Sequence, residues 1–285
     1  SRASFLDFML DVELDDDYQE FYEEEGTEAD EAGGPRINAQ KFKIPNVMDV
    51  LPDGVQSESY LDMGCGGGWI MESLRSKLHP DSMTGVDISS TRLQEAKQRN
   101  PDARFLRAPV ESVPVQSDSF DLITCLDVIE HLKEPNRVLE EANRLAPRLV
   151  IKFPIEDTLF DRFQKELWWP FKRSVKAWLH GNEPEEHFEA HLHRFNFGSA
   201  RSLLESNGFR IVDESIILNP WMEGESFMYP PAYNINDSSP TGKKIDFHLK
   251  RGILKGTRMM TYLLLNPFYY RIFNSGIYLY CERRD

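Results

Sequence analysis

The most informative segment of this 285-residue chain is Leu61-Asp62-Met63-Gly64-Cys65-Gly66-Gly67-Gly68. A short apolar run over residues 60–63 leads into a turn rich in glycine, and a helical pattern over 69–78 follows directly. Glycines at a strand-to-helix turn allow positive φ angles and let a ligand approach the backbone closely. The stretch therefore predicts a strand, a ligand-binding turn and a helix, in that order.

Short apolar runs continue to alternate with helical patterns on the C-terminal side of this turn. Strands are predicted over 60–63, 83–86, 104–106, 120–126, 148–153, 209–218 and 276–281, and helices over 69–78, 91–98, 135–145 and 199–205. Such alternation is typical of βαβ units. We therefore expect an α/β fold built on a mostly parallel sheet.

A second acidic residue supports a nucleoside-binding site. Asp87 closes the next predicted strand, nineteen positions after Gly68, where a carboxylate can accept both hydroxyls of a ribose. A dinucleotide fold would instead use the spacing G-x-G-x-x-G, but here Gly68 comes one position early and Asp62 lies two positions before Gly64. A carboxylate facing the cofactor opposes a pyrophosphate, whereas it can hold a cationic group.

With these residues the chain resembles the class I S-adenosylmethionine-dependent methyltransferases, whose first motif has the form D-x-G-C-G-x-G. The motif is matched by Asp62, Gly64, Cys65, Gly66 and Gly68, and the resemblance continues through 85–89, 111–114, 119–122 and 127–132 before thinning out after about Val212. The resemblance implies a Rossmann-like seven-stranded sheet with helices on both faces, and S-adenosylmethionine as the cofactor.

The same resemblance implies roles for individual residues. Asp62 and the glycine turn would lie along the methionine part of the cofactor, and Asp87 would hold the ribose. Pro109 departs from the family, which often has Asp after the third strand to hold the adenine amino group. The cofactor-binding residues implied are Asp62, Gly64, Cys65, Gly66, Gly68, Asp87, Ile88, Val110 and Leu126.

Candidate catalytic residues follow the fourth predicted strand. The spacing of Asp127, Glu130 and His131 predicts that they share one face of a helical turn. His131, with Glu130 and His193, could act as a general base on an acceptor hydroxyl. Alternatively, Asp127, Glu130 and His131, helped by His191 or His193, resemble a divalent-metal site, or Glu130 pairs locally while His131 packs under the turn. We assign no metal ligand.

Composition limits the classes of partner. A net charge of −14 would repel a phosphate backbone, which disfavours nucleic acid as a partner. Three scattered cysteines predict no disulfide framework and no zinc site. The acidic residues 1–34 have no signal-peptide pattern and predict a flexible tail on a cytoplasmic protein.

Residues 35–285 are expected to form one methyltransferase domain with two insertions, at about 157–194 and 219–274, that build a substrate cap. Tryptophans and histidines in the first insertion suit a lid over a flat or apolar acceptor, or packing on the core. Basic and aromatic residues over 247–273 suit a packed cap helix, a peripheral membrane contact or a dimer contact.

These features predict transfer of a methyl group from S-adenosylmethionine to a small-molecule or lipid-linked acceptor, at oxygen. Oxygen follows from His131 as the candidate base. Two alternatives stay open: a metal-dependent RNA-end methyltransferase, and a non-catalytic scaffold protein that binds the cofactor.

Overall fold

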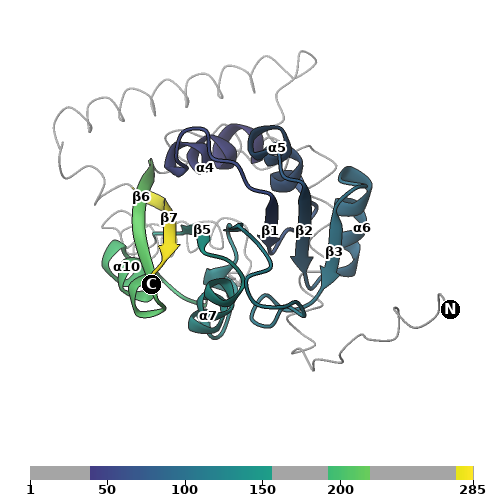
Figure 1. The fold of residues 1–285 in the computed structure, drawn as a ribbon. Coiled ribbons are helices and arrows are strands. Elements are labelled where there is room, and N and C mark those ends of the chain that lie inside the picture. The colour runs from purple at the N-terminus through teal and green to yellow at the C-terminus, as the bar shows by residue number, and fades with distance from the viewer. Residues whose placement is uncertain (1–38, 156–191, 219–273, 285) are drawn as a thin grey trace, which may run out of the picture.

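A seven-stranded sheet with the order β3-β2-β1-β4-β5-β7-β6 forms the centre of the computed structural model, which describes residues 39–155, 192–218 and 274–284 (Figure 1). The strands are β1 (Ser59–Met63), β2 (Ser82–Asp87), β3 (Arg104–Arg107), β4 (Leu122–Cys125), β5 (Arg148–Phe153), β6 (Phe209–Leu218) and β7 (Asn274–Arg283). Six strands run parallel, and β7 runs antiparallel to both of its neighbours, β5 and β6. The expected seven-stranded, mostly parallel fold is confirmed.

The strand order reverses at β1, which pairs with β2 on one side and with β4 on the other. In open α/β sheets, ligands bind outside the carboxyl ends of strands at such a switch point. The register sets Asp62 of β1 opposite Gly85 of β2 and Thr124 of β4. Asp62 therefore stands at the point where a ligand is expected.

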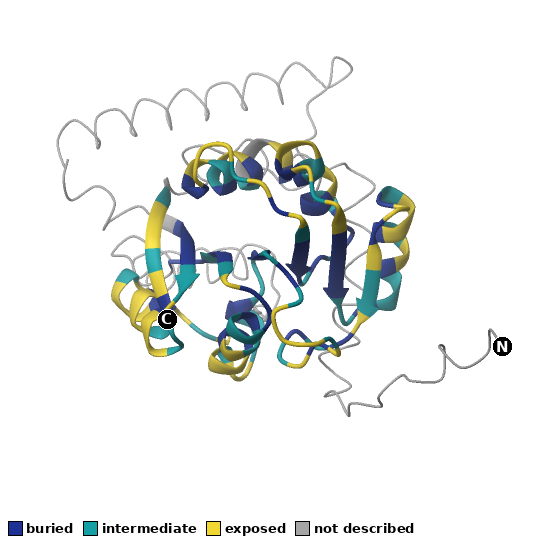
Figure 2. Ribbon diagram, in the orientation of Figure 1, coloured by how far each residue is buried: buried dark blue, intermediate teal, exposed yellow. Residues whose placement is uncertain are grey.

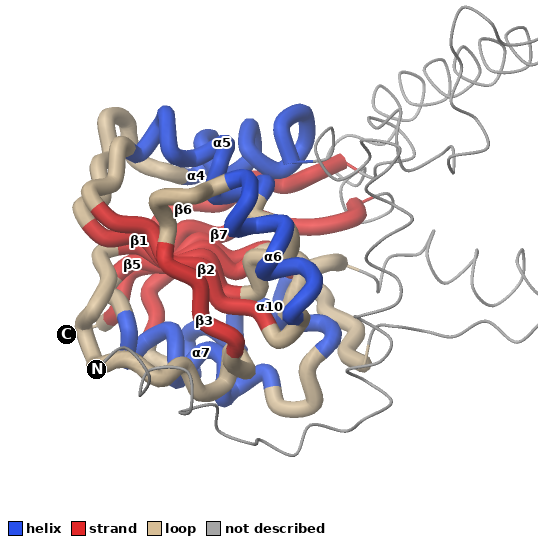
Figure 3. Tube along the Cα trace, turned by 90° about the vertical axis from the view of Figure 1, so that its right-hand side faces the viewer, coloured by secondary structure: helices blue, strands red, loops and turns tan. Residues whose placement is uncertain are grey.

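Helices cover both faces of the sheet. They are α4 (Ile44–Val50), α5 (Trp69–Leu78), α6 (Ser90–Arg99), α7 (Pro135–Leu145) and α10 (Phe197–Ser206), with a π-helical turn η1 (Ala39–Lys43) and a 3₁₀ turn η2 (Ile129–His131). Figure 3 shows α4 and α5 on one side of the sheet and α7 on the other. The inward faces of these helices are buried and their outward faces are exposed (Figure 2).

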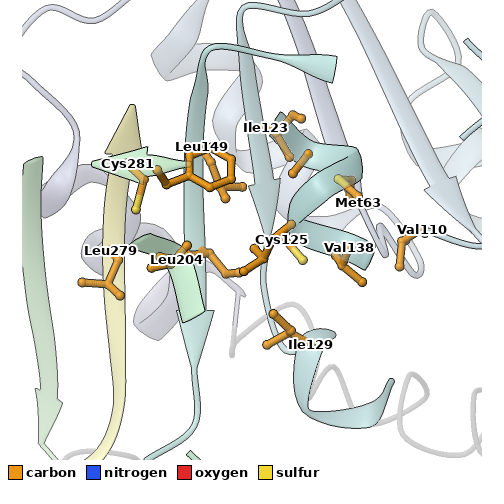
Figure 4. Packing of buried hydrophobic residues seen from close by; sticks show 14 of the residues in the cluster. Met63, Val110, Ile123, Cys125, Ile129, Val138, Leu149, Leu204, Leu279 and Cys281 are labelled. Atoms are coloured by element: carbon orange, nitrogen blue, oxygen red, sulfur yellow. The ribbon is translucent and has the colours of Figure 1, made fainter. Parts of the chain in front are cut away.

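The strands bury side chains on both faces, since successive residues point to opposite sides. On β1, Tyr60 packs with α4 and α5, whereas Leu61 packs with α7 and α10. On β7, Tyr278 packs in the layer with α4 and α5, and Leu279 packs in the layer with α7 and α10, which Figure 4 shows. The sheet thus separates two hydrophobic layers.

Most of the predicted elements are present within one or two residues of their predicted bounds. Helices 69–78 and 135–145 and strands 148–153 and 209–218 match the prediction, and the last strand is longer, at Asn274–Arg283. Helix α4 was not predicted, because a helix of only seven residues carries too little periodicity. Burial of Ile44, Val47 and Val50 against the sheet stabilises it instead.

Several predictions concern segments outside the described residues. These are the acidic segment 1–34, all but the last residues of the insertion 157–194, and nearly all of 219–274, including the proposed membrane contact at 247–273. At the edge of the first insertion, Ile155 forms an isolated parallel bridge with Phe195. Among the helices that the structure describes, none has the length and apolar character needed to cross a membrane.

Candidate functional site

The glycine turn between β1 and α5 adopts a backbone that side chains rarely tolerate. Gly64, Gly66 and Gly68 have φ angles of 74°, 48° and 78°, in the left-handed region. A Cβ on Gly64 would collide with Val128, and one on Gly68 would lie 2.7 Å from Asn100 Nδ2. At Gly64 and Gly68 the turn therefore packs too closely against neighbouring side chains to admit a Cβ.

Asp87 ends β2 beside this turn and is held by backbone donors. Its Oδ2 accepts a hydrogen bond from the Gly66 N–H at 2.8 Å, and its Oδ1 accepts one from the Ser89 N–H at 3.0 Å. Burial raises the pKa of Asp87 above its usual range, although these hydrogen bonds oppose the shift. The carboxylate is only partly covered, so its remaining lone pairs can accept hydroxyl groups.

Asp62 is almost completely buried, and only one of its two carboxylate oxygens has a hydrogen-bond partner among the described residues. Thr124 donates a hydrogen bond of 2.6 Å to its Oδ1, and the Tyr60 hydroxyl lies next to the Thr124 hydroxyl. Among the described residues, its Oδ2 has no hydrogen-bond partner. Burial raises the pKa of Asp62 to about 7, while Thr124 and Lys43 oppose that rise. The free oxygen is suited to a cationic ligand.

Asp127 joins two lysines at the carboxyl end of β4. Lys43 Nζ lies 2.6 Å from its Oδ2, and Lys152 pairs with its Oδ1. Burial alone would raise the pKa of Asp127, but Lys152 and Lys43 outweigh it and hold the pKa well below its usual range. The same contact with Asp127 raises the pKa of Lys43 against the effect of its own burial. Both carboxylate oxygens are therefore engaged by ammonium groups.

This arrangement corrects the prediction that Asp127, Glu130 and His131 share one helical face. Asp127 has a φ of 58° and precedes the 3₁₀ turn that holds the other two residues. A residue with left-handed backbone cannot belong to a right-handed helical turn, so the expected spacing does not apply to Asp127. The described residues contain no cluster of three side chains that could bind a metal ion. His191, a candidate helper ligand, lies outside the described residues.

Glu130 and His131 lie next to the edge of the first insertion. Glu130 is buried, and its carbonyl accepts hydrogen bonds from the N–H groups of Leu192 and His193 at 2.9 and 3.2 Å. His131 Nε2 lies 3.9 Å from Glu130 Oε1. His193 Nε2 lies 3.2 Å from the carbonyl of Lys133. The structure thus places His193 beside the loop after β4 that holds Glu130 and His131.

The remaining predicted residues surround the glycine turn at the ends of three strands. Cys65 and Leu126 are buried in the layer that contains α5, and Val110 is buried in the layer that contains α7. Ile88 follows Asp87 and is partly exposed. Burial raises the pKa of the Cys65 thiol well above its usual range, which makes it a packing residue rather than a nucleophile.

Sequence reasoning missed Lys43, Lys152 and Thr124, which all contact acidic residues of this site. Lys43 lies before the first strand and belongs to no motif. Thr124 had a usable signal, because a hydroxyl in an otherwise apolar strand beside β1 is a candidate partner for Asp62.

Comparison with known proteins identifies relatives of this chain. A family model described as a methyltransferase domain matches residues 61–148. The ubiquinone biosynthesis O-methyltransferase of Nitrosomonas europaea is 29% identical over 105 residues, which cover 35% of this chain and 44% of that protein. The mitochondrial enzyme of the same name from Candida albicans is 32% identical over 111 residues, covering 35% and 34%. The chain spans less than half the length of these curated relatives.

Solved structures share the fold at low identity. A chain in the complex of the Haloferax volcanii methyltransferase activator Trm112 has a TM-score of 0.56 at 13% identity, covering 94% of this chain and 98% of that chain. An S-adenosylmethionine-dependent methyltransferase of Thermotoga maritima has a TM-score of 0.54 at 15% identity, covering 94% and 100%. The [4+2]-cyclase SpnF has a TM-score of 0.50 at 15% identity, covering 81% and 77%. At these identities the likeness concerns the fold alone.

Proposed function

Because the chain belongs to the class I S-adenosylmethionine-dependent methyltransferases, we propose that it transfers a methyl group from this cofactor to a hydroxyl oxygen of a small-molecule or lipid-linked acceptor. The observation that carries the proposal is the pair of acidic residues on either side of the glycine turn. Asp62 offers a buried oxygen that has no partner among the described residues, and Asp87 offers a carboxylate that the backbone holds in place.

These residues fit the cofactor group by group. Asp62 would accept the ammonium of the methionine part, because that cation supplies the missing donor and favours the ionised carboxylate. Asp87 would accept the ribose hydroxyls. Lys43 is close enough to Asp62 to lower its pKa, and would face the negatively charged end of the methionine part. Val110 and Ile88 would line the adenine side.

Methyl transfer requires alignment of the acceptor and removal of its proton. When bound, S-adenosylmethionine supplies a methyl group on a positively charged sulfur. His131 would take the acceptor proton, since it follows β4, whose carboxyl end lies beside that of β1. The Glu130 carboxylate, 3.9 Å from Nε2, would stabilise the imidazolium. His193 would border the acceptor from the loop that Glu130 binds.

An oxygen acceptor is favoured by the names of the relatives, which are O-methyltransferases of ubiquinone biosynthesis. A hydroxylated ring on an apolar tail is therefore the first class of acceptor to test. Metal-dependent methylation of an RNA end is disfavoured, because Lys43 and Lys152 already engage both oxygens of Asp127. The net charge of −14 adds repulsion of a phosphate backbone.

Calorimetric titration with S-adenosylmethionine and with its demethylated product, S-adenosylhomocysteine, tests the cofactor assignment. We expect both to bind the full chain and Asp87→Ala to lose at least tenfold in affinity. An activity screen would then compare a hydroxylated quinone precursor with the matching amine. Absence of binding by the unmodified chain would contradict the proposal, and binding without methylation of any acceptor would favour the scaffold alternative.

A further inference from the structure

Helix α6 contacts both halves of the proposed cofactor site. At its start, the N–H of Ser89 donates to Asp87 Oδ1, and the Ser89 hydroxyl caps the helix by accepting from the Arg92 N–H at 3.3 Å. At its end, the side chains of Arg99 and Asn100 reach the glycine turn. Helix α6, ten residues long, therefore connects Asp87, which would hold the ribose, with the glycine turn.

Asn100 is fully buried directly after α6, and its Nδ2 donates a hydrogen bond of 3.0 Å to the carbonyl of Gly68. The same carbonyl also accepts the first hydrogen bond of α5, from the Glu72 N–H at 3.1 Å. Gly68 has a φ of 78°, and Asn100 Nδ2 occupies the space that a Cβ at this position would need. Asn100 therefore helps to orient this peptide group and, together with the positive φ and Ala96, accounts for glycine at this position.

Arg99 makes the corresponding contact one residue earlier in the turn. Its Nη1 donates to the carbonyl of Gly67, and its guanidinium lies over the indole ring of Trp69, 3.3 Å from the ring centroid. Stacking on an aromatic face keeps the planar guanidinium in a single orientation. Two consecutive carbonyls of the turn are therefore bound by two consecutive side chains.

We propose that Arg99 and Asn100 are positioning residues that orient the glycine turn toward the methionine part of the cofactor. The inference rests on the proposed function. With their carbonyls bound at the end of α6, the peptide groups of Gly67 and Gly68 cannot rotate independently. Their position relative to Asp87 is set by α6 together with the hydrogen bond from the Gly66 N–H to Asp87. Loss of either contact should weaken binding of the methionine part while leaving the Asp87 side of the site intact.

Two ligands separate these effects. S-adenosylhomocysteine carries the amino and carboxyl groups of the methionine part, whereas 5′-methylthioadenosine carries the same adenosine without them. We expect Asn100→Ala and Arg99→Met to weaken S-adenosylhomocysteine about tenfold and methylthioadenosine less than about twofold, as measured by calorimetry. Arg99→Lys, which keeps a donor for the Gly67 carbonyl, should recover part of the loss.

Lys97→Met is the matched control. Lys97 donates to the carbonyls of Pro101 and Ala103 at the same end of α6 but makes no described contact with the turn, so its removal should change neither affinity. Equal weakening of both ligands by the Arg99 and Asn100 variants, or weakening of neither, would overturn the inference. If Asn100→Ala does not fold, the partly exposed Arg99 still provides the test. Failure of the unmodified chain to bind either ligand would instead contradict the proposed function.

Discussion

At the scale of single residues, the buried carboxylate of Asp62 is the feature that most needs an explanation. Burying a carboxylate of which one oxygen has no hydrogen-bond partner in the described part of the chain costs free energy, and burial here raises the pKa of Asp62 to about 7. Acidic residues with strongly shifted pKa values occur preferentially at catalytic and ligand-binding sites. A cation bound at Oδ2 would offset this cost. The ionised Asp62 therefore destabilises the folded protein but favours cofactor binding.

The first prediction concerns the pH dependence of cofactor binding. Protonation of Asp62 would remove the charge that holds the ammonium, so affinity for S-adenosylmethionine should fall as the pH drops from 8 to 6. Asp62→Asn should bind about tenfold or more weakly at pH 8 and lose much of this dependence. Calorimetry at several pH values measures both effects. An Asp62→Asn variant with unchanged affinity would contradict the assignment.

The second prediction concerns His131. Replacing it with Gln should lower kcat on a hydroxyl acceptor by about 100-fold or more, because general-base catalysis typically contributes that much. Affinity for S-adenosylhomocysteine should stay within about twofold of the unmodified chain. The control is His79→Asn, at an exposed helix end where a φ of 47° suits asparagine. An unchanged kcat in the His131 variant would instead favour a packing role.

At the scale of elements, the glycine turn links β1, α5 and α6. A third prediction separates the cost of its left-handed backbone from the cost of clashes with neighbouring side chains. Gly68→Ala should destabilise the protein by more than Gly54→Ala, although both glycines have φ angles near +75°. At Gly54 nothing lies within 4 Å of the added Cβ, so only the left-handed backbone costs free energy, about 1 to 2 kcal/mol. At Gly68 the Cβ also collides with Asn100 and Ala96.

Urea denaturation of both variants measures this difference as a change in the midpoint at constant m-value. Equal destabilisation by the two substitutions would mean that α6 moves away from the turn without cost. That result would also weaken the case for Asn100 as a positioning residue.

At the scale of the whole molecule, the buried acidic residues predict how stability depends on pH. The pKa values of Asp62 and Asp87 are raised, so the folded state binds protons more tightly than the unfolded state. The contribution of these two residues to stability should therefore decrease as the pH rises from 5 to 8. Asp127 has a lowered pKa, and its stabilising contribution is constant in this range and is lost only at more acidic pH.

Denaturant unfolding at pH 5, 6, 7 and 8 tests this fourth prediction. The difference between the unmodified chain and Asp62→Asn isolates the contribution of Asp62, because the other titrating groups are common to both. The variant should become more stable relative to the unmodified chain as the pH rises. A constant difference over the whole range would mean that Asp62 stays ionised in the folded protein throughout, which would contradict its raised pKa.

Some helices and residue placements could be predicted from the sequence, and others could not. Helix 135–145 was predictable because a proline starts it and its apolar residues recur at helical spacing. The placement of Asp127 on a helical face was wrong, because spacing alone does not indicate a residue with a φ of 58°. Helix α4 escaped prediction because its stability comes from packing on the sheet.

The order of strands and helices along the chain, the glycine turn and the two acidic residues beside it were all predictable from the amino-acid sequence. Each of these depends on local periodicity, on backbone freedom or on spacing within one βαβ unit. The ion pairs of Lys43 and Lys152 with Asp127, and the contacts of Arg99 and Asn100 with the turn, became visible only in the folded chain. These contacts join residues from separate elements, and their partners are set by how the elements pack, which no local pattern of side chains encodes.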